Sequence, residues 1–290
     1  MAIEIGRIGI WHPGRVWDAA GDELEEAAAE LEELGYGAIW SGSSQANLAR
    51  QGRMLSATDR IVAATGIVNI WLNAADELSG NFQRLNVQHP DRLLIGLGSS
   101  HAPQVEAAGI TYARPLTRLR RYLDELDTMT EGIPKDRRVL AALGPKALSL
   151  AAERSLGAHP YLVTPEHTRQ ARERMGPGAL LAPEQKVVLE SDPARAREIA
   201  RDALPVYLRL PNYTNNLKRQ GFGDEDFADG GSDRLVDALV AWGGVDAILE
   251  RIAEHRQASA DHVSIQVLGS AGLPRGEWRT LGEALRGATA

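Results

Sequence analysis

The sequence has no cysteine among its 290 residues, which excludes disulfides, thiolate metal sites and cysteine nucleophiles. It also lacks any apolar run approaching the roughly 18 residues that a membrane-spanning helix requires. The opening residues Met1-Ala-Ile-Glu-Ile-Gly6 lack the basic start and apolar stretch of a secretory signal. We therefore expect a cytoplasmic protein with no membrane partner.

Clustered positive charge is scarce as well. The formal net charge is −7, and the densest basic group is Arg118, Arg120 and Arg121, which has the spacing of a solvated helix face. Binding to nucleic acid requires a basic surface that neutralises phosphates. The sequence therefore predicts no nucleic-acid partner.

The sequence does contain a regular alternation of strand-like and helix-like segments. Short apolar segments predict strands at residues 7–11, 38–40, 61–71, 92–98, 139–143, 161–163, 185–190 and 262–268. Helical periodicity and capping residues predict helices at 22–35, 48–59, 74–87, 114–127, 144–154, from 164, and at 192–208, 234–242, 246–258 and 277–285. The short connections require parallel crossovers. Eight strands paired with helices predict one (β/α)8 TIM barrel domain over residues 1–290.

One segment, residues 209–233, interrupts this regularity. It contains Pro211-Asn-Tyr-Thr-Asn-Asn216 and a run rich in Gly and Asp, which predict loop or short-helical structure. A stretch of about 25 residues with little regular structure is more often functional than a plain linker. We predict an insertion after strand seven that lies as a flexible loop over the barrel mouth.

The stretch from Arg92 to His101 is where we first expect a ligand. Its apolar part, Arg92-Leu-Leu-Ile-Gly-Leu-Gly98, is typical of a strand buried on both faces. Glycines at the carboxyl end of such a strand let a flat ligand approach the backbone, although tight packing alone would also explain them. Gly96-x-Gly98 lacks the third glycine of a dinucleotide-binding motif.

Position at the carboxyl ends of the predicted strands selects further candidates, because barrel enzymes build their sites there. These candidates are rich in glycine, tryptophan and hydroxyl groups: Trp11, His12 and Pro13; Ser41, Gly42 and Ser43; Asn69, Ile70 and Trp71; Gly144, Pro145 and Lys146; Tyr161 and Thr164; Glu190; and Gln266. They include no HxH or HExxH motif and no carboxylate cluster, so we predict no metal site.

Three of the candidates carry titratable groups with specific hypotheses. His101 and His12 are possible catalytic acid/base groups because imidazole titrates near neutral pH, and the alternative for each is a hydrogen-bonded structural histidine. Lys146 is a possible Schiff-base lysine, with an anion contact or plain solvent exposure as alternatives.

Several longer segments also carry a resemblance. They include Ala63-Ala-Thr-Gly-Ile-Val-Asn-Ile-Trp71, Gln88-His-Pro-Asp-Arg-Leu-Leu-Ile-Gly-Leu-Gly-Ser-Ser-His101, Ala141-Ala-Leu-Gly-Pro-Lys146 and Gly157-Ala-His-Pro-Tyr-Leu-Val-Thr-Pro-Glu-His-Thr168. Their order and spacing over nearly the whole chain resemble the bacterial luciferase-like monooxygenase superfamily, and within it the actinobacterial F420-dependent oxidoreductases.

The resemblance implies a barrel enzyme that binds the deazaflavin F420, or alternatively FMN, acts on a small-molecule substrate and often forms a homodimer. It implies a bulge with a non-prolyl cis peptide around Ile67, Val68 and Asn69, behind the cofactor ring. It further implies that cofactor-binding residues lie at the other strand ends, namely Ser41, Gly42, Gly96, Gly98, Ser99, Leu143, Gly144, Pro145, Lys146, Tyr161 and Thr164.

Two departures from the relatives leave the acid/base group open. Ser41-Gly-Ser-Ser44 stands where relatives often carry an acidic residue or a histidine, and Ser99-Ser-His101 stands where F420-dependent sugar-phosphate dehydrogenases use a glutamate. The competing hypotheses are an FMN-dependent monooxygenase or reductase, a non-catalytic F420-binding barrel, and a cofactor-free isomerase or aldolase.

Overall fold

The structure is a computed structural model that describes residues 3–287, and its centre is one parallel sheet. The strands are β1 (Ile8–His12), β2 (Ala38–Ser41), β3 (Val62–Thr65), β4 (Val68–Asn69), β5 (Leu93–Gly98), β6 (Arg138–Leu140), β7 (Gly157–Ala158), β8 (Leu180–Leu181), β9 (Glu184–Val188), β10 (Val240–Trp242) and β11 (Val263–Val267). Their order is β10-β9-β11-β1-β2-β3-β5-β6-β7-β8, with β4 beside β5. Because β8 and β9 are parts of one run of chain, the order returns close to where it began. This is the arrangement of a TIM-like barrel.

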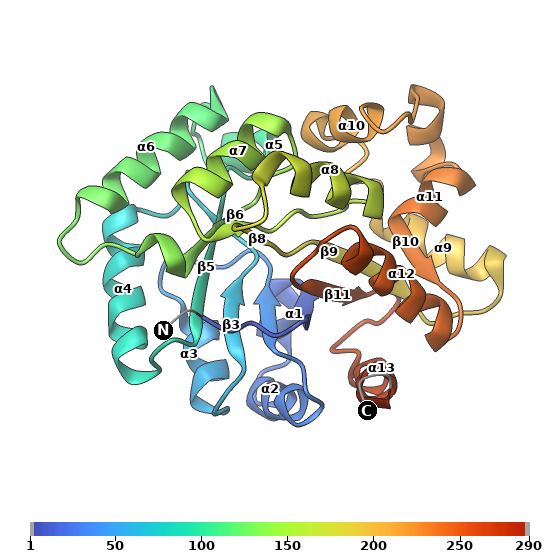
Figure 1. Ribbon diagram of the computed structural model, residues 1–290, viewed down its shortest axis with the longest axis horizontal. Coiled ribbons are helices and arrows are strands. Elements are labelled where there is room, and N and C mark those ends of the chain that lie inside the picture. The colour runs from blue at the N-terminus through green and yellow to red at the C-terminus, as the bar shows by residue number, and fades with distance from the viewer. Residues whose placement is uncertain (1–2, 288–290) are drawn as a thin grey trace.

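Helices follow the strands along the chain and lie around the sheet (Figure 1). They are α1 (Gly14–Ala19), α2 (Glu23–Glu33), α3 (Ala49–Ser56), α4 (Ala75–Gln88), α5 (Ala102–Glu106), α6 (Pro115–Thr128), α7 (Pro145–Arg154), α8 (Pro165–Met175), α9 (Pro193–Ala203), α10 (Pro211–Lys218), α11 (Asp233–Leu239), α12 (Val245–Gln257) and α13 (Arg275–Gly287), with 3-10 helices η1 (Lys135–Arg137) and η2 (Asp224–Gly230). Within residues 3–287, none of them is long and apolar enough to cross a membrane. The predicted α/β fold with a parallel sheet is confirmed.

The strands bury side chains on both faces, which explains their continuous apolar sequences. In β2, Ile39 packs in the layer between sheet and helices, whereas Ala38 and Trp40 belong to a separate buried cluster on the opposite face. That second cluster also holds Val62 and Leu94 from the neighbouring strands. Side chains that alternate between two apolar layers leave polar chemistry only at the strand ends.

Three of the predicted strands and helices differ in the structure. The segment predicted as one strand, residues 61–71, is divided into β3 and β4, and the peptide bond between Gly66 and Ile67 is cis. Strand six is not at 161–163 but at Gly157–Ala158, where a Cβ on Gly157 would lie 1.9 Å from the Leu180 carbonyl oxygen. Glycine is unfavourable within strands in general, so the close pairing of Gly157 with Leu180 was not recognisable from the sequence. The helix predicted at 234–242 ends at Leu239, and its last residues form β10 beside β9.

The segment 209–233 is also more regular than a loop, since α10 and η2 occupy much of it. At three of the predicted helix starts a side chain caps the helix: Thr164, Asp192 and Ser232 accept backbone N–H groups at the starts of α8, α9 and α11.

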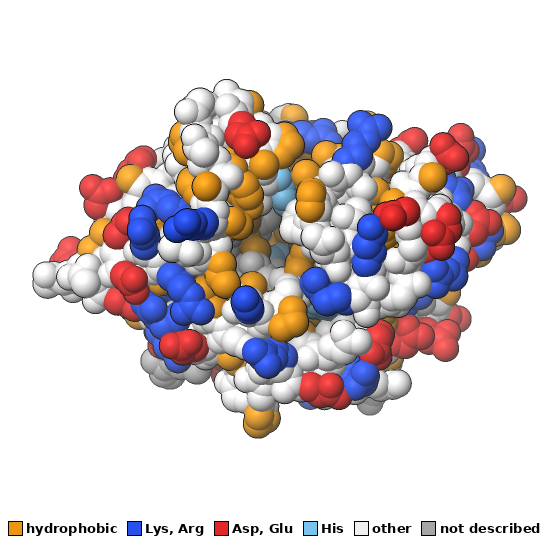
Figure 2. All heavy atoms as spheres, turned by 90° about the horizontal axis from the view of Figure 1, so that it is seen from above, with side chains coloured by type: hydrophobic (Ala, Val, Ile, Leu, Met, Phe, Trp, Pro, Cys, Tyr) orange, Lys and Arg blue, Asp and Glu red, His pale blue; other side chains and the backbone are white. Residues whose placement is uncertain are grey.

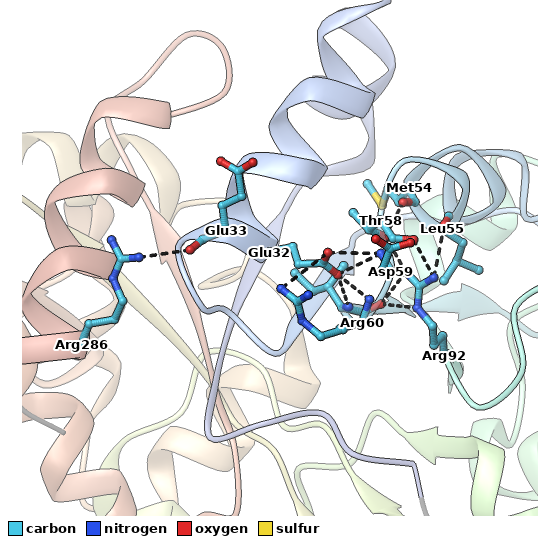
Figure 3. A network of polar contacts seen from close by, with 10 residues as sticks. Glu32, Glu33, Met54, Leu55, Thr58, Asp59, Arg60, Arg92 and Arg286 are labelled. Atoms are coloured by element: carbon cyan, nitrogen blue, oxygen red, sulfur yellow. Dashed lines mark hydrogen bonds and ion pairs between the residues drawn. The ribbon is translucent and has the colours of Figure 1, made fainter. Parts of the chain in front are cut away.

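A polar network fixes the turn that leads into β3 (Figure 3). The Glu32 carboxylate accepts hydrogen bonds from the backbone N–H groups of Asp59, Arg60 and Ile61. Burial favours a higher pKa for Glu32, but these N–H donors outweigh it and hold the pKa below its usual value. The Arg92 guanidinium donates to backbone carbonyl groups in the same turn, including that of Ile61. The network therefore anchors the start of β3, at the opposite end of the strand from the candidate site.

Candidate functional site

A cavity of about 670 Å³ opens where the strands end. Trp11 of β1 and residues that follow β2, β3, β5, β6 and β7 line it, together with residues of α10. Figure 2 looks onto this face and shows a hollow with histidine atoms inside it and Lys and Arg side chains around its rim. The position agrees with the general rule that barrel sites lie at the carboxyl ends of the strands.

One wall of the cavity is the turn between β3 and β4. Gly66 and Ile67 line the cavity, and Ile67 lies against β5. A Cβ on Gly98 would be 2.9 Å from Cγ1 of Ile67, and a Cβ on Gly96 would be 2.0 Å from the Thr65 carbonyl oxygen. The two glycines of β5 are therefore required for packing against this turn, and they stand behind the cavity wall.

His101 faces the cavity from the loop after β5. Its ring centroid is 5.5 Å from that of Tyr213 on α10. Burial lowers the pKa of His101, and a hydrogen bond with Asn212, also on α10, opposes the decrease. The predicted acid/base residue is thus placed against the segment that was expected over the mouth.

Aromatic side chains form a second wall. The Trp11 ring centroid is 4.9 Å from that of Tyr161, which is 5.4 Å from that of Tyr207. Tyr213 lies 5.3 Å from Tyr207. Burial raises the pKa of Tyr161 and of Tyr213 well above 10, so both phenols are neutral at pH 7.

A buried ion pair supports this wall from inside the sheet. Lys186 Nζ lies 2.9 Å from Glu184 Oε1 and 3.1 Å from Gln266 Oε1, and 3.7 Å from the centroid of the Tyr161 ring. The Tyr161 hydroxyl donates to the same Gln266 oxygen at 2.8 Å. Burial lowers the pKa of Lys186, and the neighbouring Glu184 carboxylate opposes the decrease. The network fixes the orientation of Tyr161.

Beside the start of α7 lies a second pocket of about 350 Å³. It shares Leu143 and Arg219 with the main cavity and is also lined by Arg174. Gly144 provides no side-chain cap for α7, so the N–H groups of the first turn have no side-chain partner there. A helix start of this kind, flanked by guanidinium groups, suits an anionic ligand.

The predicted site residues divide into three groups. Those that line the main cavity are Trp11, Ser43, Ile67, Asn69, Ser99, His101, Leu143, Gly144 and Tyr161. Pro145 lines the second pocket. The residues that line neither are His12, Pro13, Ser41, Gly42, Val68, Ile70, Trp71, Gly96, Gly98, Lys146, Thr164, Glu190 and Gln266.

Several residues of this last group have clear structural partners instead. His12 lies edge-on to Trp17 and Trp278, with ring centroids 6.3 Å and 6.0 Å away, and burial lowers its pKa to about 4. The Ser41 hydroxyl accepts a hydrogen bond from Arg50 at 2.6 Å, and the Gly42 carbonyl accepts another from the same guanidinium. These three residues therefore contribute to the packing around the site.

Other cavity residues were not predicted from the sequence. They include Tyr112, His159, Tyr207, Asn212, Tyr213 and Arg219. Asn212 and Tyr213 lie in a segment expected over the mouth, which was the one available signal for them. His159 follows a strand whose start the sequence placed four residues too late. Among the described residues, no group of three His, Asp or Glu side chains could hold a metal.

A cavity at the strand ends of a TIM-like barrel lies where barrel enzymes carry their active sites. The chain belongs to the luciferase-like monooxygenase family, whose family model matches residues 7–262. Members of this family are F420- or flavin-dependent, and the protein is an oxidoreductase.

Solved structures share the fold at low identity. An F420-dependent secondary alcohol dehydrogenase, in complex with an F420–acetone adduct, is 14% identical with a TM-score of 0.75, covering 99% of this chain and 100% of that chain. An F420-dependent tetrahydromethanopterin reductase from Methanopyrus kandleri is 16% identical with a TM-score of 0.70, covering 97% and 99%. An EDTA monooxygenase from Chelativorans sp. BNC1 is 12% identical with a TM-score of 0.74, covering 98% and 94%. A comparison with curated proteins gave no match.

Proposed function

We propose that the protein is an F420-dependent oxidoreductase that transfers a hydride between C5 of the deazaflavin and a small, uncharged organic substrate. The observation that carries the proposal is that the main cavity and the second pocket lie on either side of shared lining residues, Leu143 and Arg219. A site of this form suits a flat ring joined to a long, negatively charged tail. The net charge of −7 does not oppose this, because Arg219 and Arg174 supply positive charge locally.

The residues present fit such a cofactor. The turn at Gly66 and Ile67, with Asn69 beside it, would support the ring, and the start of α7 at Gly144 with Arg219 would hold the phosphate. When bound, F420 supplies a carrier that accepts or donates a hydride. The chain itself would orient the ring, exclude water and move the proton that balances the hydride.

The cavity also favours an uncharged substrate. Apart from Arg219, its described lining carries no Lys, Arg, Asp or Glu side chain, its imidazoles are those of His101 and His159, and much of the lining is aromatic or aliphatic. Burying a neutral polar group without a hydrogen-bond partner costs about 2–7 kcal/mol. Burying a charged group without a partner in such surroundings costs more. His101 would exchange the proton with the substrate, because it is the imidazole that lines the cavity from the loop after β5.

Equilibrium titration of the purified protein with F420 and with FMN tests the cofactor. We expect tighter binding of F420, and comparable or tighter binding of FMN would support a flavin-dependent monooxygenase instead. Arg174→Gln should weaken F420 binding about tenfold while FMN affinity changes little, since a hydrogen bond to a charged group contributes about 1.5–3 kcal/mol. Arg169→Gln is the matched control, because Arg169 lies on the same helix but pairs with the exposed Glu166.

Turnover of reduced F420 with a panel of carbonyl and enone compounds, and of oxidised F420 with alcohols, tests the enzymatic role. Binding without turnover of any compound would favour the non-catalytic barrel.

We further propose that residues 209–233, through α10, cover the mouth as part of a single domain, and that the protein forms a homodimer. Limited proteolysis with and without F420, and sedimentation analysis, check these two points.

A further inference from the structure

His159 is a buried side chain in the cavity wall whose orientation is fixed. It follows β7 and is 1% exposed. Its ring stacks on Trp40, with centroids 4.1 Å apart and an interplanar angle of 10°. Its Nδ1 lies 2.7 Å from the carbonyl oxygen of Ala182. Because a carbonyl oxygen only accepts hydrogen bonds, Nδ1 carries the hydrogen, and in the neutral ring Nε2 is left as an acceptor.

That acceptor has no hydrogen-bond partner in the described structure. Nε2 lies toward Gly66, since a Cβ built on Gly66 would be 3.5 Å from it, and both residues line the cavity. Two other buried histidines provide a contrast. His262 uses both ring nitrogens, with Gly6 and Trp40, and His255 uses both with Thr168 and Gln185.

The protonation state of His159 agrees with an acceptor role. Burial lowers its pKa to about 4, and the hydrogen bond to Ala182 opposes the decrease only in part. At neutral pH the ring is therefore uncharged. A buried acceptor without a partner is unfavourable, and such groups in native proteins usually have a specific reason.

We propose that Nε2 of His159 accepts a hydrogen bond from an N–H or O–H group of the ligand in the cavity. The inference rests on the proposed function, and it assigns His159 as a binding residue that orients the ligand. Two groups have this chemistry: the ring imide N–H of the cofactor and the hydroxyl of an alcohol substrate. The experiment below distinguishes them.

Two substitutions separate the two nitrogens of the ring. In His159→Asn the side-chain amide can still donate to Ala182, as Nδ1 does, but nothing remains at the place of Nε2. In His159→Gln the longer side chain can place an acceptor near Nε2 and loses the geometry of the Ala182 bond. If His159 binds the ligand, His159→Asn should lower ligand affinity more than His159→Gln does. If its role is purely structural, His159→Gln should lower ligand affinity more.

F420 affinity is measured first, by titration without substrate. An affinity about 10- to 100-fold lower in His159→Asn, with His159→Gln closer to the parent, identifies the cofactor imide as the donor. Unchanged F420 affinity in His159→Asn, with KM for an alcohol raised by a similar factor, identifies the substrate hydroxyl. His255→Asn is the control for a buried histidine that lines neither pocket, and it should lower stability without changing F420 affinity.

A second measurement does not depend on whether the variants fold. In parent protein with ¹⁵N-labelled histidine, the Nε2 chemical shift of His159 should move on addition of F420 or of F420 with alcohol. An unmoved shift with both, or equal ligand affinities in His159→Asn and the parent, overturns the inference while leaving the proposed function intact. A parent that binds neither F420 nor FMN overturns the proposed function and this inference together.

Discussion

Replacing Lys186 by methionine should lower the free energy of unfolding by about 3–5 kcal/mol, the usual cost of removing one partner of a buried ion pair. The Lys186 side chain is 1% exposed and that of Glu184 is 0% exposed, with 2.9 Å between Nζ and Oε1. Without the ammonium group, the Glu184 carboxylate keeps the hydrogen bond from the backbone N–H of Leu162, at 3.0 Å. Methionine has a similar volume, so the loss comes mainly from the unpaired charge and little from a cavity.

Two further variants isolate the charge effect. Lys218→Met makes the same substitution in an ion pair with Asp224 whose side chains are 45% and 84% exposed, and it should cost no more than about 1 kcal/mol. The double variant Glu184→Gln with Lys186→Met removes both charges and should be more stable than Lys186→Met alone, because a buried ion pair contributes little net stability over neutral groups.

Urea unfolding followed by circular dichroism measures these differences. Equal slopes of the free energy of unfolding against urea concentration show that the variants unfold in the same transition as the parent. The reasoning is refuted if Lys186→Met is no more destabilising than Lys218→Met. It is also refuted if the changes in free energy of unfolding caused by Glu184→Gln alone and Lys186→Met alone add up to the change in the double variant. Paired groups in contact should instead show an interaction energy.

Three further predictions concern the site, pH and the β3 turn. His101→Gln should slow single-turnover hydride transfer by about 10²–10⁴ while F420 affinity stays near that of the parent; a change of only a few-fold would make His101 a structural residue. Burial lowers the pKa of His159 and His262 to about 4, whereas an unfolded histidine titrates near 6.5. The unfolded chain therefore binds more protons between these values, and the free energy of unfolding should fall as pH decreases from 6.5 toward 4; equal urea midpoints at pH 7 and pH 5 would contradict this. Glu32→Gln should destabilise the protein by about 1–2 kcal/mol through weaker acceptance of backbone N–H groups, and Glu33→Gln serves as the control with little expected effect in the same unfolding assay.

The local sequence determined much of the fold. Continuous apolar segments such as Leu93–Gly98 reflect burial on both faces of a parallel strand, and this property is written in consecutive residues. Helix starts at Thr164 and Asp192 were equally predictable, because a capping side chain bonds to an N–H group only three residues away.

Short and irregular elements depended on partners that are distant in the chain. β7 contains a glycine because Leu180 approaches it too closely for any side chain, and nothing near Gly157 in the sequence states that distance. The two glycines of β5 were interpreted as ligand positions, but their closest neighbours are Thr65 and Ile67. A glycine signals close approach, while only the tertiary structure identifies what approaches.

The same distinction applies to the candidate site. The sequence by itself determined its location at the strand ends and placed His101 there, because strand direction follows from the alternation of strands and helices. It did not determine that His12 packs against Trp17 and Trp278, or that Tyr213 faces His101. Whether a histidine is enclosed by the core or open to a cavity depends on side chains supplied by remote segments, and only the tertiary structure brings those segments together.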